Sequence, residues 1–204
     1  LMHQYKIDAY LITMSDPHLS EYVAEHWRII KWFSGFSGST GNLVITRDFA
    51  GLWTDSRYFI QAEEQLKDSG IELVKLKVAH TPEFIDWISQ ALSSDSTVAF
   101  DGKLLPATLV KMMELKFSEK QIQIMSDCDF ISELWKERPE VPHNEIFIHE
   151  LKYAGLSGKE KLDMVKSEMS KSNSDYFIIS SLEDIAWLFN IRGRDIPYVP
   201  VTIC

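Results

Sequence analysis

The sequence is poor in cysteine, with only Cys128 and Cys204 among its 204 residues. Two distant cysteines cannot form the disulfide framework of a small secreted domain, so this content is typical of a reducing compartment. No apolar run approaches the ~18 residues that a membrane-spanning helix requires, and no charged-then-apolar leader opens the sequence. Because the first residue is Leu1, a removed leader remains compatible with it. We therefore expect a cytoplasmic protein without a membrane partner.

Clusters of lysine and arginine are also missing. The formal net charge is -9, from 21 Lys and Arg against 30 Asp and Glu. Binding to a nucleic-acid backbone requires a basic face, so we expect no nucleic-acid partner. With 45% hydrophobic and 25% charged residues, the chain can bury a core and does not resemble a disordered one.

What the sequence does contain is an alternation of predicted strands and helices. Apolar runs predict strands at 7–13, 42–46, 51–54, 71–78, 98–101 and 122–125. Helical spacing predicts helices over 18–27, 55–69, 81–92 and 106–117, with Asp16 capping the first and Asp55 or Ser56 the second. This alternation predicts a layered α/β domain.

A proline-containing linker at 138–142 leads to a segment that repeats part of the first. There, Ser157 and Glu160 predict a capped helix, 175–180 a buried strand and 185–190 another helix. Residues 8–12 match 175–179, and 32–38 match 187–193 position for position. Two domains of one fold would explain the repeat, and chance similarity of apolar stretches is the alternative. Because the second copy stops before its strand pair, we expect a piece of a longer protein.

The first copy contains an insertion with metal-type side chains. From Ile12 to Ile30 is 18 positions, whereas from Ile179 to Ile185 is 6, a difference of 12. Imidazole and carboxylate groups at helical spacing could bind a divalent ion, although acidic groups near a helix start also stabilise its dipole. A contact with substrate or with another surface is the third reading, and all three stay open for this group, which comprises Asp16, His18, Glu21, Glu25 and His26.

The glycine loop at 35–41 and Arg57 after it are the other candidates. The loop lacks the lysine of a phosphate-binding P-loop, and a strand rather than a helix follows it. Glycines here indicate a tight turn close to another surface. Arg57 lies where a helix is predicted to start, which is unfavourable for an unpaired cation. It therefore either pairs with Asp55 or Asp16, or binds an anionic or carbonyl ligand.

Several motifs in a fixed order resemble one known family. They are I-D-A-Y-L-I from Ile7, D-P-H-L-S-E-Y from Asp16, W-F-S-G-F-S-G-S-T-G from Trp32, L-W-T-D-S-R-Y-F-I-Q-A-E-E-Q-L from Leu52, L-W-K-E-R-P from Leu134, Y-A-G-L-S-G-K-E-K-L from Tyr153 and I-A-W-L-F-N-I-R-G-R-D-I-P-Y from Ile185. Together they are similar to the N-terminal region of Xaa-Pro aminopeptidases of the creatinase/prolidase superfamily. The resemblance covers nearly the whole chain.

The resemblance implies a three-layer, ribonuclease H-like α/β domain over 1–127, followed by a linker and a partial second copy of that fold over 128–204. It implies a homodimeric parent enzyme that removes an N-terminal residue preceding proline. Two divalent metal ions, usually manganese, would be bound by two Asp, one His and two Glu of a catalytic domain that this sequence does not contain. We expect no catalytic residue, metal ligand or cofactor in this chain.

The resemblance also implies site residues. Arg57 corresponds to a peptide-binding arginine, and His18, Phe36, Ser37 and Ser39 are expected toward the catalytic cleft. Thr40 stands where the family commonly has alanine. Expected partners are a peptide with proline at its second position and the chain's own catalytic domain. Two alternatives are a stand-alone binding or oligomerisation module without peptidase activity, and a small metal protein that uses the insertion.

Overall fold

The computed structural model describes residues 1–203, so Cys204 lies outside the described residues. The chain divides into two compact units, which are described separately below. The first comprises residues 1–21 and 27–139, and the second comprises residues 22–26 and the chain from Glu140 onward. Among the described residues, no helix is both long enough and apolar enough to cross a membrane.

A six-stranded mixed sheet forms the centre of the first unit, in the order β4-β3-β2-β1-β5-β6. Strand β2 is antiparallel to both of its neighbours, β1 and β3, whereas β4 is parallel to β3, β5 to β1 and β6 to β5. Strand β1 has a neighbour on each side, and all of its residues are buried. The strands are β1 (Ala9–Thr13), β2 (Asn42–Thr46), β3 (Ala50–Thr54), β4 (Glu72–Lys75), β5 (Thr97–Ala99) and β6 (Gln123–Met125).

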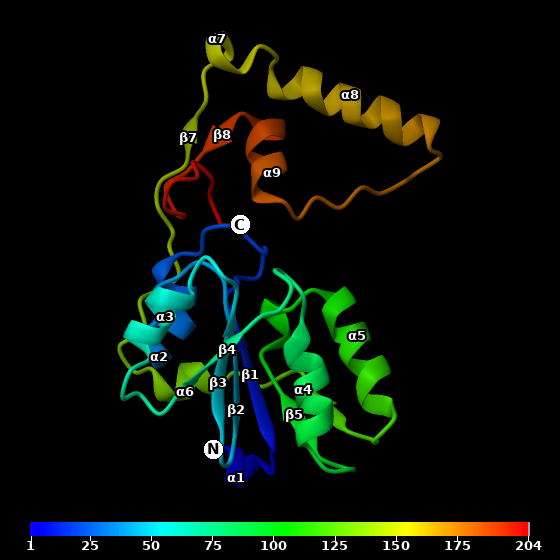
Figure 1. Cartoon of the computed structure of the whole chain (residues 1–204). Helices are drawn as coiled ribbons and strands as arrows, with labels where there is room; N and C mark the ends of the chain where they lie inside the picture. The colour runs from blue at the N-terminus through cyan, green and yellow to red at the C-terminus, as the bar shows by residue number, and fades with distance from the viewer. Residues whose placement is uncertain (204) are drawn as a thin grey trace. The chain divides into compact units, whose positions relative to one another are not determined.

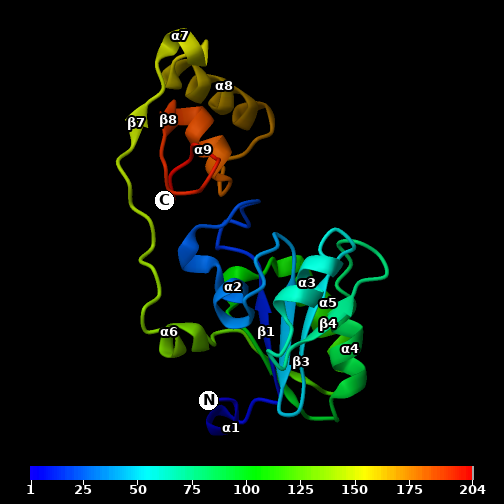
Figure 2. The ribbon, with the colours of Figure 1, turned by 60° about the vertical axis from the view of Figure 1, so that its left-hand side comes forward.

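Helices cover both faces of this sheet and give the unit three layers. Helices α4 and α5 lie along one face, while α2 and α6 lie on the other (Figures 1 and 2). The helical segments of this unit are α1 (Met2–Tyr5), α2 (Ile29–Ser34), α3 (Phe59–Gln65), α4 (Glu83–Ala91), η2 (Gly102–Leu104), α5 (Ala107–Ser118) and α6 (Phe130–Leu134). The short segment η1 (Glu25–Trp27) has residues in both units. The predicted three-layer α/β class is confirmed.

The core lies between these layers because successive strand residues point to opposite faces. On one face of β3, Trp53 contacts Trp87 of α4, with ring centres 5.2 Å apart. The preceding residue, Leu52, is fully buried on the other face, beneath the glycine loop. Burying large apolar side chains on both faces stabilises the sheet by about 1.5–3 kcal/mol for each side chain.

The helix predicted from His18 to Trp27 is wrong. Only the short segment η1 is helical there, before α2 begins at Ile29. Asp16 Oδ1 instead accepts hydrogen bonds from the backbone N–H groups of His18 (2.9 Å) and Ser20 (3.0 Å). Leu19 between them has a left-handed backbone, with φ of 56°. Since that conformation does not continue a right-handed helix, Asp16 orders a turn rather than capping a helix.

The predicted cap of the next helix is wrong as well. Helix α3 begins at Phe59 after Tyr58, and neither Asp55 nor Ser56 caps it. Asp55 Oδ1 accepts the backbone N–H of Arg57 at 3.1 Å, which closes a turn between β3 and the helix. This turn places Arg57 before the helix, outside its first turn.

The second unit contains three helices and a two-stranded pairing, in which β7 and β8 are antiparallel. The predicted capping box is confirmed, since Ser157 and Glu160 satisfy each other's backbone N–H groups at the start of α8. The elements are β7 (Phe147–Ile148), α7 (Leu151–Ala154), α8 (Gly158–Lys171), α9 (Leu182–Phe189) and β8 (Ile191–Arg192).

The repeat predicted from sequence has a structural counterpart at two helix ends. Helix α2 ends at Gly35 and α9 ends at Asn190, which are matched positions of the repeat, and both have left-handed backbones with φ of 77° and 52°. A left-handed residue directly after a helix satisfies its last carbonyl groups. The matched stretches therefore end their helices by the same local geometry.

The buried strand predicted over 175–180 is wrong. These residues form neither helix nor strand, and Tyr176 and Ile178 are 90% and 89% exposed. In the first unit, the matching strand β1 has partners on both sides. In the described part of the second unit, the only paired strands are β7 and β8, which pair with each other. Without a neighbouring strand to accept its hydrogen bonds, an apolar sequence alone does not form a strand.

Candidate functional site

Arg57 lies directly after the carboxyl end of β3 and is anchored to Asp55. Its Nε and Nη2 atoms donate to Asp55 Oδ1 at 2.9 Å and Oδ2 at 2.7 Å. Nη2 also donates to the Thr40 hydroxyl at 3.2 Å. The side chain of Asp55 is 2% exposed and that of Arg57 is 54% exposed. A buried carboxylate therefore accepts two hydrogen bonds from one edge of an exposed guanidinium.

The glycine loop is tied to α3 by neutral hydrogen bonds. The Ser37 N–H donates to Gln65 Oε1 at 2.9 Å, and Gln61 Nε2 donates to the Ser37 hydroxyl at 3.0 Å. The hydroxyls of Ser39 and Tyr58 are 2.6 Å apart. The Arg57 guanidinium also lies 5.4 Å from the centre of the Tyr58 ring. We call Arg57, its partners and these loop and helix residues the Arg57 cluster. It consists of Ser37, Ser39, Thr40, Asp55, Arg57, Tyr58, Gln61 and Gln65.

Phe36 supports this cluster from beneath. Its side chain is fully buried, and its ring meets the Tyr58 ring edge-on with centres 5.9 Å apart. An added Cβ at Gly38 would overlap Phe36 Cζ and lie 2.9 Å from Tyr58 Cδ1. Phe36 and Tyr58 thus leave room only for glycine at position 38, and the burial of Phe36 fits a supporting role better than direct ligand contact.

Gly38→Ala is expected to lower the free energy of unfolding of the first unit by about 1–3 kcal/mol, because both aromatic rings must move to admit the methyl group. Chemical denaturation of the variant measures this loss. Gly70→Ala is the control: Gly70 has a φ of +77° but no atom within 4 Å of an added Cβ. It reports backbone strain without crowding, at a cost of about 1 kcal/mol. Equal stability of Gly38→Ala and the native chain would show that the two rings move without cost, which would contradict the prediction.

The electrostatics of the cluster keep Arg57 charged and partly available. The hydrogen bond from the Arg57 side chain holds the pKa of Asp55 below its ordinary value, although burial opposes this shift. The same hydrogen bond raises the pKa of Arg57. Within the described part of the chain, Arg57 Nη1 has no hydrogen-bond partner. Its two N–H groups can donate to a carboxylate or carbonyl oxygen.

The structure brings together four of the five residues predicted from the resemblance: Arg57, Phe36, Ser37 and Ser39. The fifth, His18, lies half-buried on the turn after β1, where its backbone N–H donates to Asp16. Residues 1–203 contain no group of three His, Cys, Asp or Glu side chains placed to bind a metal ion.

Sequence reasoning missed Thr40, Tyr58 and the two glutamines as members of the site. Gln61 and Gln65 are polar and lie four residues apart on α3. The residue that follows each of them, Ala62 and Leu66, is apolar and buried. This spacing places the glutamines on one polar face, a signal that was present in the sequence. Thr40 gave no local signal, because its contact with Arg57 spans 17 positions.

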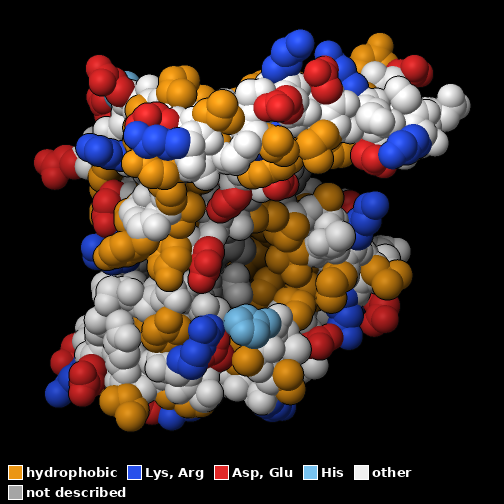
Figure 3. Space-filling model, turned by 90° about the horizontal axis from the view of Figure 1, so that it is seen from above, with side chains coloured by type: hydrophobic (Ala, Val, Ile, Leu, Met, Phe, Trp, Pro, Cys, Tyr) orange, Lys and Arg blue, Asp and Glu red, His pale blue; other side chains and the backbone are white. Residues whose placement is uncertain are grey.

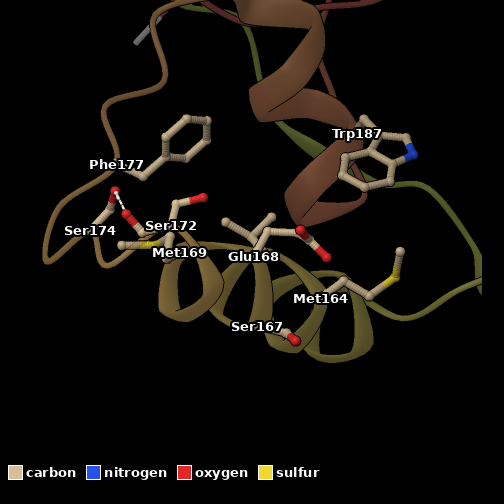
Figure 4. Close-up of a pocket in the computed structure, with 9 residues that line it drawn as sticks. Met164, Ser167, Glu168, Met169, Ser172, Ser174, Phe177 and Trp187 are labelled. Atoms are coloured by element: carbon tan, nitrogen blue, oxygen red, sulfur yellow. Dashed lines mark hydrogen bonds between the residues drawn. The ribbon is translucent and has the colours of Figure 1, made fainter.

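A groove lies within the second unit. Figure 4 shows Phe177 and Trp187 beside side chains of α8, around a groove of about 570 Å³. Met164, Met169 and Glu168 line it from α8. Phe177 is 62% and Trp187 45% exposed, so the groove walls are apolar and open. The groove lacks the converging polar groups of a small-molecule site.

Charged side chains form no single-sign field on the face seen in Figure 3. Lys and Arg side chains (blue) are interspersed there with Asp and Glu side chains (red).

The sheet, with helices on both faces, and the Arg57 cluster define the class of protein. It is a three-layer α/β domain with a polar candidate surface for an anionic or carbonyl group. Residues 1–130 match the family model described as Creatinase/Prolidase N-terminal domain, and residues 137–204 match a second model of the same description. The chain belongs to the creatinase/prolidase N-terminal domain family. The resemblance drawn from its motifs is confirmed, as is a second copy of related fold.

Relatives with high similarity are aminopeptidases. The chain is 38% identical over 198 residues to Aminopeptidase P2 of Arabidopsis thaliana, covering 96% of this chain and 28% of the relative. It is 37% identical to Xaa-Pro aminopeptidase 1 of Dictyostelium discoideum, covering 98% and 33%.

A solved structure extends this similarity to three dimensions. The X-prolyl aminopeptidase of Caenorhabditis elegans, described as a cytosolic enzyme with a di-nuclear active site, matches with a TM-score of 0.87 at 32% identity. The match covers 96% of this chain and 32% of that protein. The chain thus spans about a third of the length of these relatives.

Proposed function

We propose that this chain is the non-catalytic N-terminal region of a metal-dependent aminopeptidase that removes an N-terminal residue preceding proline. The observation that carries the proposal is the similarity over 96% of the chain to the X-prolyl aminopeptidase of C. elegans. In this assignment, domain I comprises residues 1–127, and the linker and partial domain II comprise 128–204. The chain would shape substrate access to a catalytic domain and contribute to assembly.

Peptide binding is assigned to the Arg57 cluster. The outward Nη1 edge of Arg57 would donate to a carbonyl or carboxylate oxygen of the peptide, while Asp55 holds the opposite edge. Ser37 and Ser39 would contribute hydroxyl groups from the glycine loop, where they contact Gln61 and Tyr58, and Phe36 supports that loop. His18 is assigned a separate contact from the turn after β1.

The chemistry is assigned to residues outside this chain. A catalytic domain with two divalent ions, manganese in our proposal, would activate the water that attacks the peptide bond. The di-nuclear active site of the C. elegans relative supports two ions, and its cytosolic description supports a cytoplasmic location. We also propose that the whole enzyme is a homodimer, which light scattering of the longer protein would establish.

Two preparations test the proposal: this chain, and a longer chain that includes the sequence encoded after residue 204. Each is incubated with an Xaa-Pro peptide and manganese. We expect turnover only by the longer chain, with loss of activity after chelation. Turnover by the 204-residue chain itself would overturn the non-catalytic assignment. An inactive longer chain with an intact metal centre would overturn the assigned reaction.

The second candidate is a stand-alone binding or oligomerisation module. The exposed apolar walls of the groove at Phe177 and Trp187 are the observation that favours it. The reading frame distinguishes the two: a stop codon directly after Cys204 supports the module. Two Asp, one His and two Glu codons at metal-ligand positions downstream support the enzyme.

A further inference from the structure

Arg57 is held more firmly than an exposed arginine usually is. Three of its groups donate to Asp55: the backbone N–H at 3.1 Å, Nε at 2.9 Å and Nη2 at 2.7 Å. Two parallel bonds from one edge of a guanidinium to both oxygens of a carboxylate fix the plane of the group. The direction of the remaining edge is therefore set by Asp55.

Thr40 provides a second anchor from a different segment. Its hydroxyl accepts Arg57 Nη2 at 3.2 Å, while its carbonyl accepts the Thr54 hydroxyl at 2.6 Å. Thr54 is the last residue of β3 and is fully buried. The sheet thus holds both anchors of the guanidinium, one through Asp55 and one through the glycine loop.

The pairing leaves one edge of the cation free. The side chain of Asp55 is almost fully buried, whereas that of Arg57 is half in solvent. A rigid cation with one free edge is what a binding surface requires, because a preorganised donor loses less entropy when it binds.

We propose that Asp55 and Thr40 are positioning residues that aim the Nη1 edge of Arg57 at a peptide carbonyl or carboxylate oxygen. Asp55 sets the plane of the guanidinium, and Thr40 limits its rotation out of that plane. The kinetic part of this inference rests on the proposed function, whereas the positioning itself is a property of this chain.

The positioning is tested by NMR on this chain, from the hydrogen exchange of the Arg57 Nε–H. We expect Asp55→Asn to speed this exchange at least tenfold, because an amide oxygen replaces only one of two charged acceptors. Thr40→Val should have a smaller effect. Asp8→Asn, which removes the carboxylate 3.4 Å from Arg47, is the matched control and should leave Arg57 unchanged. Unchanged exchange in Asp55→Asn would overturn the proposal.

The function of the positioning is tested by a double-mutant cycle in the longer, active enzyme. Asp55→Asn and Arg57→Gln should each raise KM for an Xaa-Pro peptide about tenfold, the loss expected for a charged hydrogen bond. The double variant should be no worse than Arg57→Gln, because Asp55 acts through Arg57. Full additivity would overturn the proposal.

Failure of the peptide contact and failure of the positioning give different results. If Arg57→Gln leaves KM unchanged, the peptide contact in the proposed function fails, and the NMR result still decides whether Asp55 orients Arg57. If Asp55→Asn does not fold, Asp55→Glu replaces it: the longer side chain keeps the charge but displaces the guanidinium. We then expect a raised KM with an unchanged melting temperature, and an unchanged KM would overturn the proposal.

Discussion

Lys161→Ala is expected to lower the free energy of unfolding of the second unit by about 3 kcal/mol, because it leaves buried acceptors without donors and creates a cavity. Lys161 is a lysine of α8 that is only 2% exposed. Its Nζ donates to the Trp187 carbonyl at 2.8 Å and to Asn190 Oδ1 at 2.5 Å. It also lies 4.6 Å from the centre of the Trp187 ring.

The effect is large because one ammonium group joins several segments. Asn190 ends α9, and its Nδ2 donates to the Leu156 carbonyl at 2.8 Å. The Asn190 carbonyl accepts the His149 N–H at 2.7 Å, next to β7. A cation at the end of α9 also interacts favourably with its dipole. Loss of Lys161 therefore loosens α8, α9 and the β7–β8 pair together.

Hydrogen exchange of peptides from α8 and α9 measures this loss separately from the first unit. Lys161→Met fills most of the volume but cannot donate, so we expect about two thirds of the alanine effect, or about 2 kcal/mol. Lys166→Ala, an exposed position of the same helix, is the control and should change stability by less than about 0.5 kcal/mol. If Lys161→Ala costs no more than this control, the buried ammonium group does not hold the unit together.

Asp195→Asn is expected to destabilise the second unit by about 2 kcal/mol at neutral pH, since an amide cannot serve donors on both of its sides. Asp195 is 4% exposed. Its Oδ1 accepts the N–H and Nδ2 groups of Asn144 at 2.8 and 2.9 Å. Its Oδ2 accepts the Thr202 hydroxyl at 3.0 Å and the Ile203 N–H at 2.9 Å.

The loss should depend on pH in a defined direction. Burial opposes ionisation of Asp195, but the hydrogen bonds from Asn144, Ile203 and Thr202 outweigh it and hold its pKa below the ordinary value. A depressed pKa means that the stabilisation is complete above the unfolded aspartate pKa of about 3.9 and is lost as the pH falls toward the folded value. The stability gap between the native chain and Asp195→Asn should therefore narrow in acid.

Denaturation of both proteins between neutral and strongly acidic pH measures that gap. Asp175→Asn, which removes an exposed carboxylate of the same unit, should show no gap at any pH. A gap for Asp195→Asn that stays constant into acid would show that its cost is steric and independent of charge.

The fold shows which features short-range pattern can predict. Strands β1 to β6 and helices α4 and α5 were predicted close to their observed ends, since periodic apolar residues and proline at helix starts act within a few positions. The box of Ser157 and Glu160 is equally local. The helix predicted over 18–27 failed because Asp16 can order a turn as readily as a helix start, and only the left-handed Leu19 distinguishes them.

The candidate site also has a part that the sequence predicted and a part that only the structure showed. Arg57, Ser37 and Ser39 were identified from their motifs, and the structure places them in one cluster. The choice of Asp55 over Asp16 as the partner of Arg57 came from the structure, as did the burial of Phe36.

By itself, the sequence determined the α/β class, the repeat, the family and the exposed arginine. Each of these depends on residue types within a short stretch of the chain. Tertiary structure decided which carboxylate orients Arg57, and it placed Lys161 in the interior although its helix is mostly polar. It also left 175–180 outside any sheet. The physical reason is that burial and pairing depend on contacts between distant residues, such as the 29 positions between Lys161 and Asn190.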